Sequence, residues 1–179
     1  MTASAAPRSR VLLIGVGNAY RGDDAVGLMV AQRLQEEPLD HVTTVLATGE
    51  GTTLLTLWQD SDAVVLVDAV YTGARPGTLR RFAAHAQPLP MLFARASTHA
   101  FGVAEAVELA RALHQLPSVF VVYGVEGATF EMGVGLSAAV AAAVPQAAAQ
   151  VRQELRALID RVAPGCVHSE AHGEVSQHA

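Results

Sequence analysis

Several acidic side chains and one histidine follow apolar segments of this chain, and together they could bind a divalent cation. Asp23 and Asp24 come shortly after the first apolar run, Asp68 lies within a second run, and His99 belongs to the stretch STHAFG. Two carboxylates and an imidazole form a mixed oxygen and nitrogen donor set. Such a set suits zinc, nickel or cobalt better than magnesium or calcium. The residue types therefore indicate metal-linked or carboxylate/histidine chemistry.

Each of these residues also has a purely structural explanation when it is considered alone. Asp23 or Asp24 could cap the following helix, although both cannot occupy one cap. Asp68 could accept backbone N–H groups where a strand ends, His99 could be a structural histidine, and Glu126 could simply be solvated. The metal-site hypothesis depends on whether the fold brings these residues together.

The sequence predicts that buried strands position several of these residues. Three apolar runs, at 11–17, 63–70 and 119–126, lack polar alternation, as is typical of central strands in a parallel sheet. Two further segments, at 42–48 and 77–83, are predicted to be outer strands. The predicted sheet therefore has about five strands, which is close to the usual size of a sheet.

Helical patterns separate the strands. Apolar spacing predicts three helices before the last one. They run from Val26 to Leu34, where Pro38 stops the segment, over 52–59, and from Val103 to Leu113. Pro145 suits the first turn of a new last helix. The apolar face of this helix consists of Val151, Leu155, Leu158, Ile159 and Val162.

Alternating strands and helices imply right-handed βαβ units. The predicted fold class is α/β, a three-layer α/β/α sandwich with a mostly parallel, about five-stranded twisted sheet. We expect a flexible N-terminus at 1–9, a single domain at 10–163 and a disordered tail at 164–179. Sites in such sheets form beyond the carboxyl ends of the strands, which is where the acidic residues and His99 are expected.

Composition narrows the classes of partner. The 179 residues are 51% hydrophobic with a net charge of −5 and no basic stripe, so neither nucleic acid nor anionic lipid is an expected partner. No apolar stretch approaches the roughly 20 residues of a membrane span, and no signal-peptide pattern follows the N-terminal arginines. The single cysteine, Cys166, excludes an internal disulfide. We expect a cytoplasmic protein.

The first loop, GVGNAYRGDD at 15–24, looks like a phosphate cradle but carries the wrong charge. It has the first two glycines of a dinucleotide fingerprint, yet Tyr20 takes the third position and the paired aspartates would repel a pyrophosphate. The G-K-[ST] motif of a P-loop is missing, so a P-loop is not expected. A G-x-S-x-G elbow is also missing, which leaves nucleophilic serine chemistry without support. No organic cofactor is expected.

Four motifs in order closely resemble the hydrogenase maturation proteases. They are GVGNAYRGDDAVG, VDAV, STHAFG, and GVEG followed by GVGLS, and the similarity runs over 11–160. Members of that family remove the C-terminal extension of the large-subunit precursor of nickel–iron hydrogenases. The resemblance implies that precursor as the partner and substrate.

The resemblance also implies the site residues. The family's metal-contacting and catalytic positions correspond to Asp24, Asp68 and His99. Nickel would be supplied by the substrate precursor, and its presence would license cleavage. Whether nickel polarises the carbonyl, activates a water or only orients the bond while a carboxylate acts as base stays open. Supporting residues are expected to be Gly15, Gly17, Asn18, Asp23, Ser97 and Gly102.

Two departures from the family pattern concern loops near this site. Ala25 stands where many relatives have glycine. In ATGEGTT, Ala47 and Thr48 precede Gly49 where an acidic residue is common, while Glu50 lies within the turn. A substrate-docking role for that loop is therefore in doubt.

Two other functions compete with processing. A nickel carrier could use the same three residues without cutting anything. A peptidyl-tRNA hydrolase begins with a similar strand and turn, but it needs a histidine where this chain has Asp23 and Asp24, and a basic face for tRNA. His168, His172 and His178 lie in the polar tail, where a solvated segment is a better interpretation than a metal site.

Overall fold

The computed structural model describes residues 10–90, 101–133 and 135–162. Ser97, Thr98, His99, Cys166 and the tail histidines therefore lie outside the described residues, as do the predicted flexible N-terminus and disordered tail.

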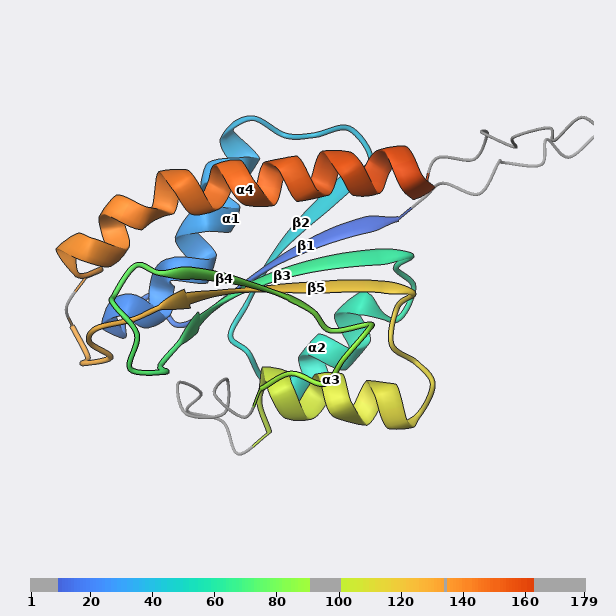
Figure 1. Ribbon diagram of the computed structural model, residues 1–179, viewed down its shortest axis with the longest axis horizontal. Helices are drawn as coiled ribbons and strands as arrows, with labels where there is room; N and C mark the ends of the chain where they lie inside the picture. The colour runs from blue at the N-terminus through green and yellow to red at the C-terminus, as the bar shows by residue number, and fades with distance from the viewer. Residues whose placement is uncertain (1–9, 91–100, 134, 163–179) are drawn as a thin grey trace, which may run out of the picture.

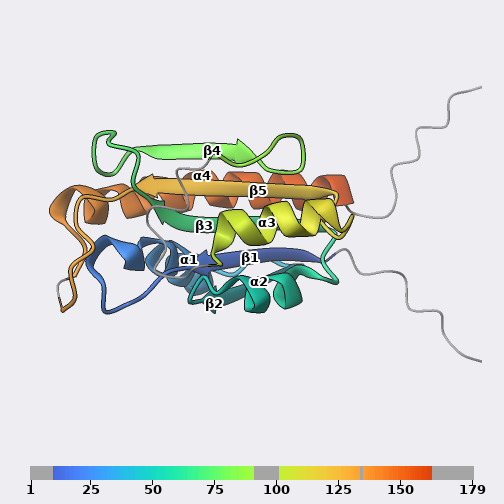
Figure 2. The same ribbon diagram turned by 90° about the horizontal axis from the view of Figure 1, so that it is seen from below.

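Five strands form one twisted sheet, as the apolar runs predict. Its order is β2-β1-β3-β5-β4, and every pairing is parallel except that of β4 with β5. Figure 2 shows the strands side by side in this order. The strands span Val11–Val16 for β1, Val42–Ala47 for β2, Ala63–Val70 for β3, Leu79–Ala83 for β4 and Val119–Glu126 for β5.

Helices cover both faces of this sheet and complete the predicted three layers. Helices α1 and α4 lie on one face, and α2 and α3 lie on the other (Figure 1). A short 3-10 helix, η1, precedes α1. The helices span Gly22–Ala25 for η1, Val26–Glu36 for α1, Gly51–Trp58 for α2, Val103–Ala112 for α3 and Ala138–Val162 for α4.

The central strand β3 is apolar except for Asp68, because helices bury both of its faces. Val65 and Val67 pack toward α1 and α4, whereas Val64 and Leu66 pack toward α2 and α3. Burial on both sides removes the polar alternation of a half-exposed strand. Trp58 of α2, the single tryptophan, packs edge-on against Phe120 with ring centroids 4.9 Å apart.

The last helix corrects one prediction. Helix α4 begins at Ala138 and runs through Pro145 without a break, so Pro145 does not start a new helix. The neighbouring Val144, Ala147 and Ala148 are buried against the sheet, while Pro145 is exposed. The carbonyl that loses its partner at the proline can therefore be hydrated, and packing on either side keeps the helix continuous. The predicted apolar face of this helix is confirmed.

The strand order places a topological switch point at the carboxyl ends of β1 and β3. From β1 the chain turns outward to β2, and then crosses back to β3 on the other side of β1. The pairing of β1 with β3 ends at Gly15 and Val67, whereas β3 continues alongside β5 as far as Val70. Asp68 is therefore the first residue of β3 beyond its ladder with β1. Such switch points are where open α/β sheets bind ligands.

Within the described ranges, no helix has the length and apolar character needed to cross a membrane.

Candidate active site

Asp68 is a nearly buried carboxylate within β3. It pairs in register with Gly124 of β5, and only 8% of its surface is exposed. By strand alternation it falls on the α2 and α3 side, in phase with Val64 and Leu66. Burial, followed by the negative charge of Asp24, raises the pKa of Asp68 to about 7, although a hydrogen bond from the Ala69 amide acts in the opposite direction. The site therefore holds a carboxyl group that changes charge near neutral pH.

Asp24 reaches the same end of the sheet from η1, which follows β1. It too is 8% exposed, and its Oδ2 lies 4.0 Å from Nη1 of Arg21. The Arg21 guanidinium also lies over the ring of Phe130, 5.6 Å from its centroid. Asp24 and Asp68 thus lie close enough to interact, but they belong to segments more than forty residues apart.

Gly17 permits the close approach of η1 to β1. Its φ of +150° is rarely adopted by other residues, and a Cβ at this position would overlap the carbonyl of Asp24. Gly15, another of the expected supporting residues, has a different role from Gly17. It lies inside β1, where a Cβ would overlap Ala31 and Gly27, and so it lets α1 pack closely on the sheet.

Asn18 shapes the loop between these glycines and η1. Its Oδ1 accepts a hydrogen bond of 2.9 Å from the Tyr20 amide, an Asx-turn geometry. The Gly17 amide in turn donates to the Ala47 carbonyl of β2 at 3.0 Å. One backbone hydrogen bond and one hydrogen bond to the Asn18 side chain therefore hold the first loop.

Asp23 is fully buried, and it does not cap its own helix. Neither η1 nor α1 has a side-chain cap. Instead its carboxylate accepts hydrogen bonds from the amides of Ala128, Thr129 and Ser137, and from the Ser137 hydroxyl, at 2.6–3.1 Å. Burial acts to raise the pKa of Asp23, but these hydrogen bonds together outweigh it, so the pKa lies below its ordinary value. The expectation that Asp23 caps a helix is therefore wrong. Asp23 instead links η1 to the loop between β5 and α4.

Glu126 ends β5 and is buried, which corrects the interpretation that it is simply solvated. Its carboxylate accepts hydrogen bonds from the amides of Thr72, Gly73 and Ala74 and from the Thr72 hydroxyl, at 2.7–3.2 Å. These contacts hold the loop after β3. The role of the Glu126 carboxylate in this structure is therefore to hold that loop.

Glu50 has a role that the sequence analysis missed. It caps the N-terminus of α2, accepting from the amides and hydroxyls of Thr52 and Thr53 at 2.7–3.0 Å. Hydrogen bonds from the Thr53 and Thr52 hydroxyls, followed by those from the amides, lower its pKa to about 2. An acidic residue directly before Gly-Thr-Thr and an apolar run was a local signal that could have revealed this cap.

The histidine motif lies partly outside the described residues, which exclude His99 and Ser97. Helix α3 begins at Val103 with Gly102 as its N-cap, and the Gly102 amide donates to Oε2 of Glu105 at 3.0 Å. The N-cap of α3 is therefore Gly102, and neither Ser97 nor Thr98 takes that position. The Phe101 carbonyl accepts from the Gly51 amide at 3.0 Å, which joins the start of the α3 segment to the start of α2.

Over the residues that the structure describes, no group of three histidine, cysteine or acidic side chains has an arrangement that could hold a metal. The described part of the site is the pair Asp24 and Asp68. On their own, two neighbouring carboxylates with one shifted pKa can bind a cation or exchange a proton near pH 7.

Comparison with known proteins assigns a class to this fold and site. The family model for hydrogenase maturation proteases matches residues 28–154. The hydrogenase expression/formation protein HupD of Rhodobacter capsulatus is 30% identical over 151 residues, which cover 83% of this chain and 72% of HupD. The hydrogenase 2 maturation protease of Escherichia coli K12 is 28% identical, over 82% of this chain and 91% of its own length.

Solved structures agree with these sequence matches. The hydrogenase maturating endopeptidase HybD from E. coli superposes with a TM-score of 0.70 at 26% identity, covering 83% of this chain and 93% of HybD. The solution structure of an endopeptidase from E. coli gives a TM-score of 0.73 at 28% identity, with the same coverage. The class is therefore that of α/β peptide hydrolases.

The chain belongs to the hydrogenase maturation protease family. This membership confirms the resemblance seen in the four sequence motifs, and it favours an endopeptidase over the peptidyl-tRNA hydrolase alternative.

Proposed function

We propose that this protein removes the C-terminal extension from the large-subunit precursor of a nickel–iron hydrogenase after nickel has been inserted. The nickel belongs to the precursor, and Asp24, Asp68 and His99 recognise it there. The enzyme needs no organic cofactor. The cytoplasmic location expected from the sequence stays a prediction that accompanies this function.

The observation that carries the proposal is the paired burial of Asp24 and Asp68 at the switch point of the sheet. Each carboxylate is only 8% exposed, and the charge of Asp24 contributes to the raised pKa of Asp68. Bringing two negative groups together in a poorly solvated crevice is unfavourable unless a proton or a cation compensates them. Arg21, 4.0 Å from Asp24, supplies part of that compensation, and a nickel ion brought by the substrate would supply the rest in place of the proton on Asp68.

Substrate-borne nickel would also position the peptide bond. Ligands from the enzyme and from the precursor would share one ion, so that the adjoining scissile bond is brought beside the two carboxylates. Because the pKa of Asp68 is about 7, this group can release its proton as the cation arrives. The enzyme would then distinguish loaded from empty precursor by whether its acidic site is neutralised.

The test is a processing assay with purified, nickel-loaded large-subunit precursor, followed by mass spectrometry of the product. The wild-type chain should shorten the precursor at its C-terminus and leave nickel-free precursor intact. His99→Ala, Asp24→Asn and Asp68→Asn should each abolish processing, whereas replacement of the exposed Asp40 by Asn should not. Equal processing by wild type and His99→Ala would remove His99 from the site.

A nickel carrier would use the same residues but would behave differently in isolation. Calorimetry with nickel alone distinguishes the two functions. Weak binding by the isolated chain together with precursor-dependent cleavage is the expected result. Tight nickel binding without cleavage of the loaded precursor would favour the carrier.

A further inference from the structure

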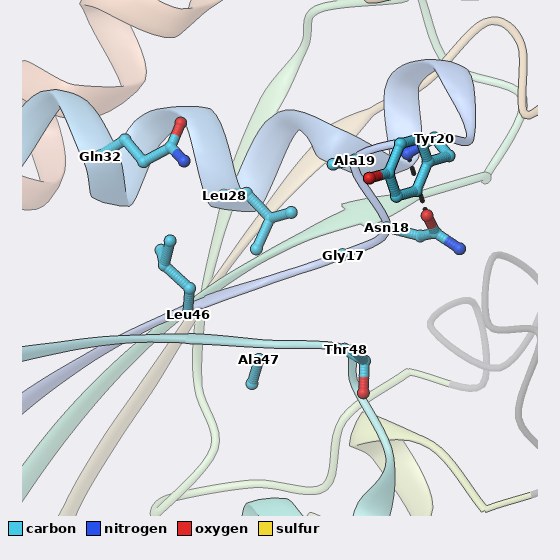
Figure 3. Close-up of a pocket in the computed structure, with 9 residues that line it drawn as sticks. All are labelled: Gly17, Asn18, Ala19, Tyr20, Leu28, Gln32, Leu46, Ala47 and Thr48. Carbon is cyan, nitrogen blue, oxygen red and sulfur yellow. Dashed lines mark hydrogen bonds between the residues drawn. The ribbon is translucent and has the colours of Figure 1, made fainter. Parts of the chain in front are cut away.

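A groove lies between α1 and the outer strand β2, next to the first loop. It has a volume of about 440 Å³. Figure 3 shows Leu28 of α1 and Leu46 of β2 pointing toward one another across it, with Tyr20 at one end. Its described lining, called the β2 groove below, consists of Gly17, Asn18, Ala19, Tyr20, Leu28, Gln32, Leu46, Ala47 and Thr48.

The chemistry of the β2 groove suits an uncharged ligand. All nine described lining residues are uncharged, and Leu28, Leu46 and the Tyr20 ring supply apolar surface. Gln32, Asn18 and Thr48 add uncharged polar groups. Leu46 is 39% exposed at a strand position that faces α1, so this apolar surface is accessible.

The neighbouring edge of the sheet can also accept a polypeptide. Strand β2, with the sequence VTTVLA, pairs with β1 on one side and has no strand on its other side within the described chain. Natural edge strands are commonly protected by charged residues or proline, and β2 has neither. An uncharged open edge is the usual feature for binding an extended peptide through its backbone.

The β2 groove lies beside the first loop, which leads to the candidate active site. Residues 17–20 form its end wall, and the same loop leads directly into η1, which carries Asp24. The β2 strand runs parallel to β1, so its carboxyl end, at Leu46 and Ala47, lies at the same edge of the sheet as Asp24 and Asp68. A chain held along β2 would therefore reach the edge of the sheet beside the loop that leads to Asp24, while the side chain of Asp68 falls on the opposite face.

We propose that the β2 groove and the open edge of β2 bind an extended, uncharged segment of the substrate polypeptide, which adds to the sheet as a sixth strand. This inference rests on the proposed endopeptidase function. An endopeptidase must hold its substrate beside the scissile bond. Here the backbone of β2 supplies affinity and the Leu28–Leu46 pocket selects an apolar side chain.

The test compares two substitutions of similarly exposed side chains. Leu46→Asp places a charge inside the groove, whereas Met29→Asp places one on α1 next to Leu28 but outside the lining, where Met29 is 43% exposed. With nickel-loaded precursor, Leu46→Asp should raise KM about tenfold or more with little change in kcat, and Met29→Asp should stay within about twofold of wild type. Fluorescence of Trp58 verifies that both variants are folded.

A second readout does not require cleavage. A synthetic peptide with the sequence of the precursor's C-terminal region is titrated into isotope-labelled protein. Chemical-shift changes concentrated at the amides of β2 and of residues 17–20, and lost in Leu46→Asp, would support the groove as the docking site.

The outcomes separate this inference from the proposed function. If wild type cleaves the precursor and Leu46→Asp cleaves it equally well, docking in the β2 groove is wrong while the endopeptidase function stands. If wild type does not cleave, the endopeptidase function fails, and the peptide titration still decides whether the groove binds polypeptide. Dimerisation that is abolished by Leu46→Asp would show that a second copy covers the groove, and would overturn the inference.

Discussion

The charge of Asp24 contributes, together with burial, to the raised pKa of Asp68, although the two residues come from different crossover units of the sheet. Asp24 arrives on the turn after β1, and Asp68 stands in β3 just beyond the end of its pairing with β1. Their interaction is thus a product of the strand order. It places two acidic groups at the switch point of the sheet, where the proposed function requires the substrate to bind.

Replacing Asp68 by Asn should stabilise the folded protein at alkaline pH. The pKa of Asp68 is raised from 3.8 to about 7, so the folded state favours the proton. Its stabilising contribution is complete below about pH 4 and is lost as the pH rises through 7. At pH 8 Asp68→Asn should therefore be more stable than wild type by roughly 2–4 kcal/mol, with a much smaller difference at pH 4.

Urea unfolding at the two pH values, followed by the fluorescence of the buried Trp58, measures this difference. Asp40→Asn, a change at an exposed position, is the matched control and should shift neither curve. A constant difference between wild type and Asp68→Asn across this range would contradict the raised pKa.

Processing of nickel-loaded precursor should increase with pH around neutrality. In the proposed function the ionised form of Asp68 would bind the cation, and with a pKa of about 7 roughly a tenth of the sites would be ionised at pH 6 compared with roughly nine-tenths at pH 8. The value of kcat/KM at limiting precursor should therefore rise several-fold across this interval, with a midpoint near 7. A flat profile between pH 6 and pH 8, for a precursor shown to retain its nickel, would exclude Asp68 as the group that titrates.

Asp23→Ala should destabilise the protein much more than Ser137→Ala. The first change leaves the amides of Ala128, Thr129 and Ser137 without their acceptor, and these are hydrogen bonds to a charged group. A loss of about 3 kcal/mol or more is expected, against about 1 kcal/mol for removing the Ser137 hydroxyl alone.

Processing should fall with the same ranking, because Asp23 anchors the turn that carries Asp24. Thermal unfolding and the precursor assay measure the two effects. Equal stability of Asp23→Ala and Ser137→Ala would show that the carboxylate does not hold the β5–α4 loop.

Gly17→Ala should impair processing, whereas Gly133→Ala should not. Both glycines have positive φ, so both alanines incur backbone strain of about 1 kcal/mol. Only at Gly17 would the added Cβ overlap the Asp24 carbonyl, since a Cβ at Gly133 meets no described atom within 4 Å. The steady-state processing rate should therefore drop at least tenfold in Gly17→Ala relative to Gly133→Ala. Similar rates in the two variants would show that η1 can shift without affecting the site.

His114→Gly should stabilise the protein at a position remote from the site. His114 follows the end of α3 with a φ of +55°, the left-handed conformation that glycine adopts without a steric penalty. The Gln115 amide donates to the Ala110 carbonyl, and the His114 amide donates to the Arg111 carbonyl. These two hydrogen bonds form a Schellman motif. A gain of about 0.5–1 kcal/mol in the free energy of unfolding, with unchanged processing, is expected. A loss of stability would mean that the imidazole makes a contact worth more than the backbone strain.

Much of the fold was predictable because its signals are local. The apolar run at 63–70 coincides with β3, and the spacing that begins at Val26 coincides with α1. The Pro145 prediction failed because the rule that proline starts helices ignores packing, and here buried residues on both sides hold α4 continuous. Local rules are reliable when the tertiary environment does not oppose them.

The interactions of the acidic residues were less predictable. The partners of Asp23 lie 105–114 residues away in the sequence, and those of Glu126 lie 52–54 residues away. No local pattern distinguishes a carboxylate that holds a distant loop from one that caps its own helix. Glu50 is the exception, since its partners are the next two threonines and its role was visible in the motif itself.

By itself, the sequence determined the succession of strands and helices, the residue types available for chemistry and the motif order of the family, because these depend on neighbours along the chain. Only the tertiary structure decided that Asp24 and Asp68 lie close enough to interact, that the pKa of Asp68 is raised to about 7, and that α1 and β2 enclose a groove beside the first loop. Burial and electrostatic interaction depend on which distant segments pack together, and that information exists only once the sheet has formed.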